Sequence, residues 1–206
     1  EKLEHKNDFP DQLMRAKAGN EEAFSDLMRR LSGRIYRGAL ALTANTHDAR
    51  DLTQETFVRA YVGLGRFKEN SSAFTRLYGI LLNVFREWLR QNKKLGVVSL
   101  DAGSAKQDAS GRREVEPQSW DLPPGETRET VTLIYLAISR LPRKQKMAIV
   151  MRCLEQMSYR EIAEVMRCSI GTVKSQIHDA RMRLDKELSA HGIVCDSKAR
   201  PGQPEA

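Results

Sequence analysis

A run of small and polar side chains near residue 175 carries hydrogen-bonding groups at helical spacing. When residues 170–184 are placed on a helix at 100° per residue, one narrow arc holds only apolar side chains, namely Ile170, Val173, Ile177, Ala180 and Leu184. The opposite face holds Gly171, Thr172, Lys174, Ser175, His178 and Asp179. Small donors and acceptors on one helix face suit the edges of base pairs in a major groove about 12 Å wide. The pattern predicts a helix that packs with one face and reads DNA with the other.

A second short helix must hold this one in place. Ser158 followed by Glu161 is a capping box, which predicts a helix start at that point. The chain breaks at Arg167 and Cys168, and Ser169 then offers a second N-cap. The buried stripe of the first helix is Ile162, Ala163 and Met166. Two helices with a corner of three to four residues predict a helix-turn-helix.

A helical hairpin whose outer face is only solvated would show much of the same pattern. Charge argues against that alternative, because residues 140–187 hold eleven basic and six acidic side chains, a net charge of +5. The small Gly171 and Thr172 pair also allows a phosphate to approach the backbone closely. These residues favour DNA binding.

The whole chain has the composition of a helical protein with a polyanionic partner. Its 206 residues are 40% hydrophobic, which suits two small domains, and its net charge is +7 with a pI near 9.5. A basic surface alone does not separate DNA from RNA or an anionic membrane. No apolar run approaches about 18 residues and no signal-peptide core is present, so a cytoplasmic protein without membrane contact is expected.

The residues that could hold a metal or perform catalysis are scattered. Cys153, Cys168 and Cys195 are widely spaced, with no histidine at ligand spacing, which predicts neither a disulfide framework nor a metal site. The four histidines lie far apart, and no paired-carboxylate motif suits a nuclease. We therefore expect no catalytic residues, no cofactor and no enzyme activity.

The segment from residue 9 to 95 reads as wholly helical. One long helix carries Phe24, Leu27, Leu31, Ile35 and Leu42 at core spacing. Thr46 is expected to cap a helix over residues 47–64, whose buried arc is Ala49, Thr53, Phe57, Ala60 and Leu64. The other side of that helix carries an acidic stripe of Asp48, Asp51 and Glu55 beside Val58 and Val62, with Gln54 and Arg59 at its margins. Exposed apolar side chains framed by charge indicate a docking surface.

A basic helix follows. Residues 66–94 hold seven basic and two acidic side chains, a net charge of +5. Ser71 or Ser72 is expected to cap a helix that buries Phe74, Leu77, Tyr78, Leu81, Phe85, Trp88 and Leu89. One opposite arc holds Thr75, Arg76, Gly79, Asn83, Arg86 and Arg90, an asparagine among guanidinium groups. This arc fits base-edge and phosphate contacts, and it equally fits a solvated basic face.

The composition changes after residue 95. Residues 96–126 are rich in Gly, Ser, Pro and Asp, and residues 95–126 hold six acidic and three basic side chains, which predicts a flexible acidic linker. Helices resume near Thr127, and Pro142 stands at a further helix start. We expect an all-α protein with domains at 9–95 and 127–190, the second with the helix-turn-helix, and a disordered tail at 191–206.

Three stretches in this order resemble the bacterial extracytoplasmic-function (ECF) sigma factors. They are D-A-R-D-L-T-Q-E-T-F-V-R-A-Y (48–61), R-F-K-E-N-S-S-A-F-T-R-L-Y-G-I-L-L-N (66–83), and the stretch L-P-R-K-Q-K to H-D-A-R (141–181). The resemblance implies two DNA-binding helical domains, regions 2 and 4, that make RNA polymerase promoter-specific. Core RNA polymerase and promoter DNA are the implied partners, together with an anti-sigma factor.

The resemblance also implies roles for particular residues. The core polymerase-binding set is Asp51, Gln54, Glu55, Val58, Arg59 and Val62. The set for the minus-10 element is Lys68, Asn70, Ser71, Ser72, Arg76, Asn83, Arg86 and Arg90, with the loop around Lys68 capturing a flipped base. The set for the minus-35 element is Ser169, Gly171, Thr172, Lys174, Ser175, His178 and Asp179.

Five positions depart from the family pattern, one of which is Gln176, where Arg is frequent. Arg76 and Gly79 replace a common Trp and Arg beside Tyr78, and Gln156 replaces the usual Gly before the capping box. Asp179 stands where Arg is frequent, and because a carboxylate accepts a hydrogen bond from cytosine N4, a shifted sequence preference is expected. The alternative of another class is a helix-turn-helix regulator that does not engage core polymerase. That alternative accounts for the helix-turn-helix but not for the motifs in residues 48–83.

Overall fold

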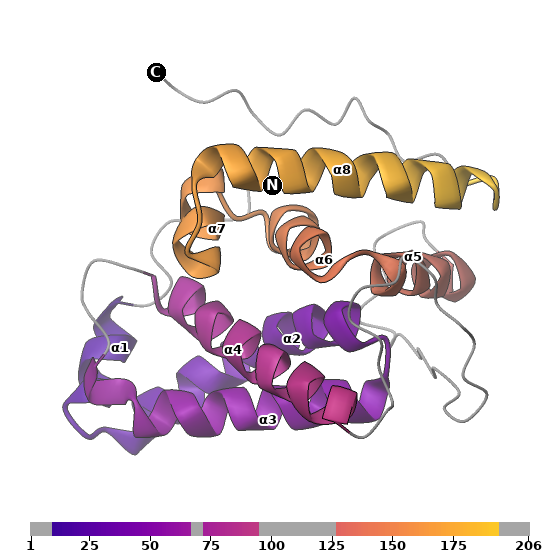
Figure 1. Ribbon diagram of the computed structural model, residues 1–206. Coiled ribbons are helices and arrows are strands. Elements are labelled where there is room, and N and C mark those ends of the chain that lie inside the picture. The colour runs from indigo at the N-terminus through magenta and orange to yellow at the C-terminus, as the bar shows by residue number, and fades with distance from the viewer. Residues whose placement is uncertain (1–9, 67–71, 95–126, 194–206) are drawn as a thin grey trace.

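The computed structural model describes residues 10–66, 72–94 and 127–193, and every regular element in these ranges is helical (Figure 1). The first half holds α1 (Pro10–Lys17), α2 (Glu21–Thr43), α3 (Thr46–Val62), the 3₁₀ turn η1 (Leu64–Arg66) and α4 (Ala73–Lys94). The second half holds α5 (Arg128–Arg140), α6 (Arg143–Ile149), the π-helical turn η3 (Val150–Leu154), α7 (Tyr159–Met166) and α8 (Ile170–Ser189). The all-α fold with a C-terminal helix-turn-helix is confirmed. The expected linker (96–126) lies outside the described residues, as does the tail from residue 194.

Short polar side chains start most of these helices. The Oδ1 atom of Asn20 accepts a hydrogen bond from the backbone N–H of Ala23 at 2.9 Å, and Thr127 caps α5 in the same way. The N-cap of α3 is Asn45, which accepts from the N–H of Asp48 at 3.0 Å. The expectation that Thr46 caps this helix is wrong by one residue, because Asn at the preceding position already satisfies the same backbone donor.

In the first half, α2 is the central helix, and α1, α3 and α4 pack against it. The five apolar residues expected in its core are all buried. On α3 the buried arc differs from the expectation, because Thr53 is only half-buried while Leu52 and Thr56 are buried. Thr56 satisfies its hydroxyl by donating to the carbonyl oxygen of Leu52 at 2.6 Å, so a polar side chain occupies the core at little cost.

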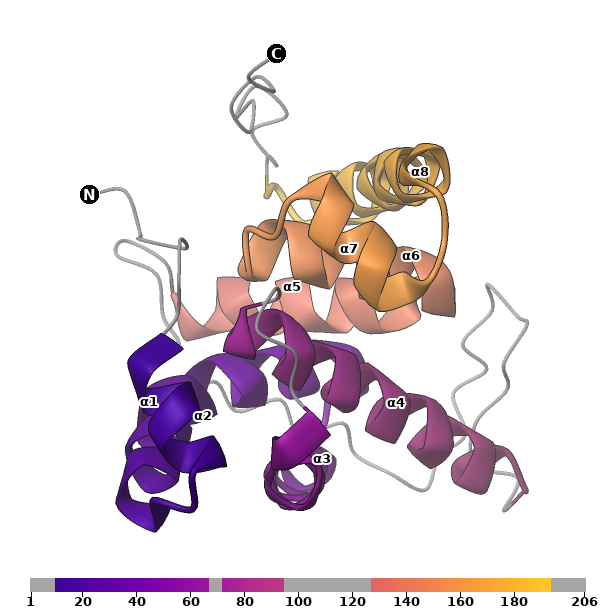
Figure 2. The ribbon, with the colours of Figure 1, turned by 90° about the vertical axis from the view of Figure 1, so that its left-hand side faces the viewer.

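The two halves form two stacked layers. Figure 2 shows α5, α6 and α7 lying over α2 and α4, and α5 and η3 contact α2 while α7 contacts α4. The guanidinium of Arg34 in α2 pairs with the Glu155 carboxylate after η3, with 3.2 Å between Nε and Oε2. The division of the chain into independent domains at 9–95 and 127–190 stays a prediction, since the structure describes the halves in contact.

A small niche in α2 admits a large side chain of α4. A Cβ atom added to Gly38 would lie 2.4 Å from the Tyr78 hydroxyl oxygen, and Tyr78 is fully buried. Gly38 therefore permits close approach of the two helices.

Replacing Gly38 tests this niche. Gly38→Ala gains about 1 kcal/mol of helix propensity, yet the overlap with Tyr78 should destabilise the protein by about 1 to 3 kcal/mol net in urea denaturation. Tyr78→Phe in the same chain should recover part of the loss. Gly79→Ala is the matched control, because nothing lies within 4 Å of its added Cβ, and it should be neutral or stabilising. Equal effects of the Gly38 and Gly79 changes would contradict the niche.

Candidate nucleic-acid and protein-docking surfaces

The helix-turn-helix is built as its sequence predicts. Ser158 and Glu161 form both bonds of the capping box, and Ser169 accepts from the Thr172 N–H at 3.1 Å to start α8. Arg167 closes α7 in a left-handed conformation with φ of 54°. Gln156, before the capping box, is also left-handed with φ of 52°, which a glycine would adopt with less strain.

The structure shows which side chains of α8 are buried and which are exposed. Val173, Ile177, Ala180 and Leu184 are buried against the rest of the half. The side chains expected to face DNA are all exposed: Ser169, Gly171, Thr172, Lys174, Ser175, His178 and Asp179. The expectation that Ile170 is buried is wrong, since this residue is 44% exposed. Ile170 is the first residue of α8 and lies at the exposed corner between the two helices.

Lys174 is restrained by a neighbouring ring. Its Nζ atom lies 6.0 Å from the centre of the Tyr159 ring, and the guanidinium of Arg152 lies 5.0 Å from the same ring. Cation–π contacts of this kind are worth about 0.5 to 1 kcal/mol at exposed sites. The cationic groups of Lys174 and Arg152 therefore both lie near Tyr159, the first residue of α7, beside the polar face of α8.

On α4 the polar arc is only partly open. Ser72 caps the helix by accepting from the Thr75 N–H at 3.0 Å, while Lys68, Asn70 and Ser71 lie outside the described residues. Arg76 and Arg86 are half-buried, and Asn83 and Arg90 are exposed.

Thr75 does not belong to that open arc. The residue is buried, and its hydroxyl donates to Glu161 Oε1 of α7 at 3.3 Å. Thr75 lies on the predicted arc of α4, but α7 covers the first turn of that arc. The spacing of residues within one helix does not show which neighbouring helix will pack on it.

A basic pocket of about 350 Å³ lies where α4 meets the second half. Arg86 of α4, Arg143 and Lys144 of α6, and Arg167 and Thr172 of the helix-turn-helix line it. Burial lowers the pKa of the Arg86 guanidinium, and the charges of Arg143 and Arg167 lower it further. No carboxylate is among the residues that line this pocket. Sequence reasoning missed Arg143 and Lys144, for which the only signal was their place at the start of a helix.

The outward face of α3 carries acidic and apolar side chains. Asp51 and Gln54 are exposed, Val58 is 51% exposed and Val62 is 82% exposed. Tyr61, which the sequence pattern missed, is 50% exposed. The centre of its ring lies 5.0 Å from the centre of the Phe24 ring. Adjacent exposed apolar side chains form a surface that a protein partner could cover.

Arg59 links this face to α4. Its guanidinium pairs with Glu55 at 2.7 Å in the same helix and with Glu87 of α4 at 2.8 Å. The hydrogen bonds to Glu55 and then to Glu87 raise the pKa of Arg59. Both partners hold the guanidinium at the edge of the docking face.

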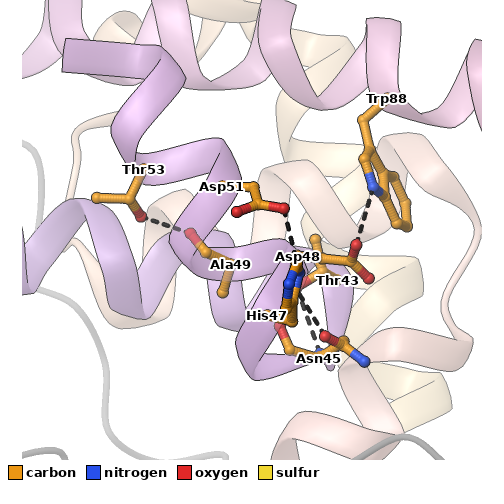
Figure 3. A network of polar contacts seen from close by, with 8 residues as sticks. All are labelled: Thr43, Asn45, His47, Asp48, Ala49, Asp51, Thr53 and Trp88. Atoms are coloured by element: carbon orange, nitrogen blue, oxygen red, sulfur yellow. Dashed lines mark hydrogen bonds and ion pairs between the residues drawn. The ribbon is translucent and has the colours of Figure 1, made fainter. Parts of the chain in front are cut away.

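The acidic stripe is shorter than the sequence suggested. Figure 3 shows Asp48 turned toward Trp88, whose indole N–H donates to Asp48 Oδ1 at 3.3 Å. Asp51 is the residue that faces outward, with His47 Nδ1 3.1 Å from its Oδ2. Asp48 therefore anchors α3 to α4 and is not part of the stripe, because a neighbouring helix supplies an indole donor that the helical arc could not foretell.

Two classes of site are absent from the part of the chain that the structure describes. No cluster of three His, Cys, Asp or Glu side chains could hold a metal ion there. None of those helices is both long and apolar enough to cross a membrane. Cys153 and Cys168 are free thiols, and Cys153 is exposed.

Comparison with known proteins identifies two family regions. Residues 27–95 match the model of Sigma-70 region 2, and residues 132–184 match that of Sigma-70, region 4. The ECF RNA polymerase sigma factor SigW of Bacillus subtilis is 31% identical over 183 residues, which cover 85% of this chain and 94% of that protein. The ECF RNA polymerase sigma-E factor of Escherichia coli is 31% identical over 184 residues, 86% of this chain and 94% of that protein.

Solved structures share the fold. CnrH, in complex with the cytosolic domain of CnrY, has a TM-score of 0.63 at 22% identity, over 88% of this chain and 97% of that one. The sigma factor RpoE of Bartonella quintana, in complex with the anti-sigma factor NepR, has a TM-score of 0.62 at 23% identity, over 81% and 96%.

Proposed function

The chain belongs to the ECF sigma factors of bacterial RNA polymerase and directs promoter-specific transcription, and from this premise we propose which surface performs each part of that task. In the proposal, α8 reads the minus-35 element, α4 with the preceding loop reads the minus-10 element, and α3 docks on the core enzyme. Residues 9–95 and 127–190 act as the two units.

The observation that carries the proposal is the division of α8 into two faces. Five apolar side chains of α8 are buried, while the seven residues expected to face DNA between 169 and 179 are all exposed. The N-terminal end of α8 offers the backbone N–H group of Gly171 to a phosphate, while that of Thr172 donates to the Ser169 cap. Ser175, His178 and Asp179 lie where base edges would be reached.

On α4, the proposed roles divide by charge. Arg76, Arg86 and Arg90 neutralise phosphates, and Asn83 reaches a base edge. The Nη1 of Arg86 donates to Asn83 Oδ1 at 2.8 Å, which orients the amide. Lys68, Asn70, Ser71 and Ser72 are proposed to receive the flipped base, whose unstacking costs a few kcal/mol that their contacts must offset.

On α3, the proposed core-binding set is the one inferred from the sequence, namely Asp51, Gln54, Glu55, Val58, Arg59 and Val62. Its apolar members and the acids beside them are accessible in the structure, which supports docking of a complementary basic and apolar surface. Tyr61 is added to the set because its ring is half exposed between them.

The remaining proposals follow from membership of the family. The chain acts in the cytoplasm, where RNA polymerase works, and an anti-sigma factor is a further partner. Sigma factors are not enzymes, and this chain is proposed to supply recognition while polymerase supplies catalysis. A regulator that never engages polymerase would leave the matched region 2 without a role.

Substitutions on α8 test whether this helix reads the minus-35 element. Ser175→Ala or Asp179→Ala should change the preference at particular upstream base pairs by about 1 to 3 kcal/mol each, because each removes one hydrogen-bonding group. Lys174→Ala should weaken binding to all promoters alike and lower the salt dependence of that binding, because the proposed partner of Lys174 is a phosphate. The measurement is transcription by reconstituted holoenzyme on a library randomised only in the minus-35 element.

Asp185→Ala is the matched control, since it removes the same group from a later turn of α8 and should leave the preference unchanged. If the preferred upstream sequence is the same in Ser175→Ala, Asp179→Ala and the control, α8 is not the reader.

A further inference from the structure

Four cationic side chains line the basic pocket, and three of them have no role in the proposed function. Arg86 comes from α4, Arg143 and Lys144 from the start of α6, and Arg167 from the end of α7. Of these, only Arg86 belongs to a proposed promoter set. The pocket therefore holds positive charge that promoter and polymerase recognition do not explain.

These cations have no acidic partner within residues 10–66, 72–94 and 127–193. The Nη1 atom of Arg86 donates to the neutral amide of Asn83, and no ion pair joins any of the four cations to a described carboxylate. Burial lowers the pKa of the Arg86 guanidinium, and the charges of Arg143 and Arg167 lower it further. The cations therefore repel one another, and an anion between them would relieve that repulsion.

The volume of the pocket suits a small molecule. About 350 Å³ lies at the lower end of the range of small-molecule sites, about 300 to 1,000 Å³. Thr172 adds a hydroxyl group to the lining, and Met147, Met166 and Cys168 complete it. Met147 is buried and Met166 is half-buried, so part of the lining is apolar. An apolar group attached to an anion would find contacts there.

The number of cations indicates the kind of anion. Guanidinium groups bind phosphate through paired N–H donors, and a lysine ammonium adds a point charge. Each phosphate group carries about 1.5 to 2 negative charges near pH 7, so two neighbouring phosphates balance four cations. A single carboxylate or a chloride ion would leave most of the positive charge uncompensated.

We propose that the basic pocket is a binding site for a small ligand that carries two or more adjacent phosphate groups. Arg86, Arg143, Lys144 and Arg167 contact the phosphates, and Thr172 supplies a hydrogen-bonding hydroxyl. The ligand contacts α4 and the second half at the same time. Inorganic pyrophosphate and nucleoside diphosphates share this chemistry, and both serve as probes.

Titration calorimetry of the full chain with pyrophosphate, at about 0.15 M salt, tests the site. Arg143→Gln with Lys144→Gln keeps both side chains polar and removes two of the four charges, so it should weaken pyrophosphate binding by about tenfold or more. Both residues are exposed, so the variant should stay folded. Arg183→Gln with Lys186→Gln is the matched control, because it removes the same two charges from exposed positions late in α8, and it should weaken binding by less than about twofold.

Alkylation of Cys168 locates the ligand. The chain for this measurement carries serine in place of Cys153 and Cys195, and Cys168 lines the pocket. Pyrophosphate at ten times its Kd should slow alkylation of Cys168 by about tenfold, because the thiol reacts only in the unoccupied fraction. Arg143→Gln with Lys144→Gln in this chain should remove most of the protection at the same pyrophosphate concentration.

Three results would overturn the site. They are equal weakening in the pocket variant and the control, alkylation of Cys168 that pyrophosphate does not slow, and sulfate binding as tight as that of pyrophosphate. Adenosine diphosphate then separates the two sources of the phosphates. Tighter binding than that of pyrophosphate identifies a nucleotide whose base meets Met147 and Met166, and equal or weaker binding identifies an inorganic polyphosphate.

Discussion

Reversing charge at both Asp51 and Glu55 should nearly abolish binding to core polymerase while the chain stays folded. Asp51 is exposed, and Glu55 is half-buried with Arg59 as its partner. Placing like charges against a basic partner surface costs several kcal/mol, so Asp51→Arg with Glu55→Arg should weaken core affinity at least 100-fold. Loss of the exposed Glu55–Arg59 pair should cost the fold no more than about 1 kcal/mol. The measurements are core binding and thermal unfolding on the same preparation.

The control for that double change uses two acids at the same helical spacing elsewhere. Glu22 and Asp26 of α2 lie four residues apart, as Asp51 and Glu55 do, and their reversal to Arg changes the net charge equally. Core affinity of this control should fall less than threefold. If the two double variants bind alike, the effect is one of net charge and α3 is not the docking face.

Removing Arg34 should weaken the packing of the two halves against each other by about 150-fold. The Arg34 side chain is 20% exposed and that of Glu155 is 1% exposed, and removal of one partner of a buried pair costs about 3 kcal/mol. Arg29→Ala is the control, because it breaks an exposed pair with Asp26 and should change little. Energy transfer between dyes at positions 50 and 186, exposed on α3 and α8, reports the separation.

The effect of Arg34→Ala should depend on pH. Burial raises the pKa of the Glu155 carboxyl when the halves are packed together, against the opposing charges of Arg34 and Arg37. A carboxyl with a raised pKa favours packing of the halves as pH falls through that pKa and opposes it as pH rises. Without Arg34 the pKa rises further, so the deficit should be largest at high pH and shrink on acidification.

Glu155→Gln in the Arg34→Ala chain isolates that carboxyl. The neutral amide should remove the pH dependence and restore part of the packing between the halves. A pH dependence that survives Glu155→Gln would assign it to another group.

Much of the local structure could be predicted from the sequence because it is decided within a few residues. The capping box at Ser158 and Glu161, the cap at Ser169 and the two faces of α8 need only neighbours along one helix. The family followed from the order of three such motifs. The resemblance also marked Gln156, which stands where the family usually has Gly and which adopts a left-handed conformation in the structure.

The features that the sequence did not show depend on contacts between distant residues. Asp48 lies on the predicted acidic arc, yet Trp88, forty residues away, turns it into an anchor. Thr75 shares an arc with Asn83, yet Glu161 and α7 cover it. Arg143 and Lys144 join Arg86 only through the packing of the two halves. Helical periodicity fixes which side chains share a face, and only tertiary packing decides which neighbour that face meets.

Each half carries the caps of its own helices, and this bears on how the halves can move relative to each other. Ser158, Ser169 and Thr127 each cap a helix from within the second half, and Asn20 and Asn45 do so in the first. Glu161 would lose its contact with Thr75 on separation but keep its bonds to Ser158. No helix has to melt or refold when the halves part. A movement of one half against the other then needs no refolding and belongs to the microsecond to millisecond class of rigid-body motions.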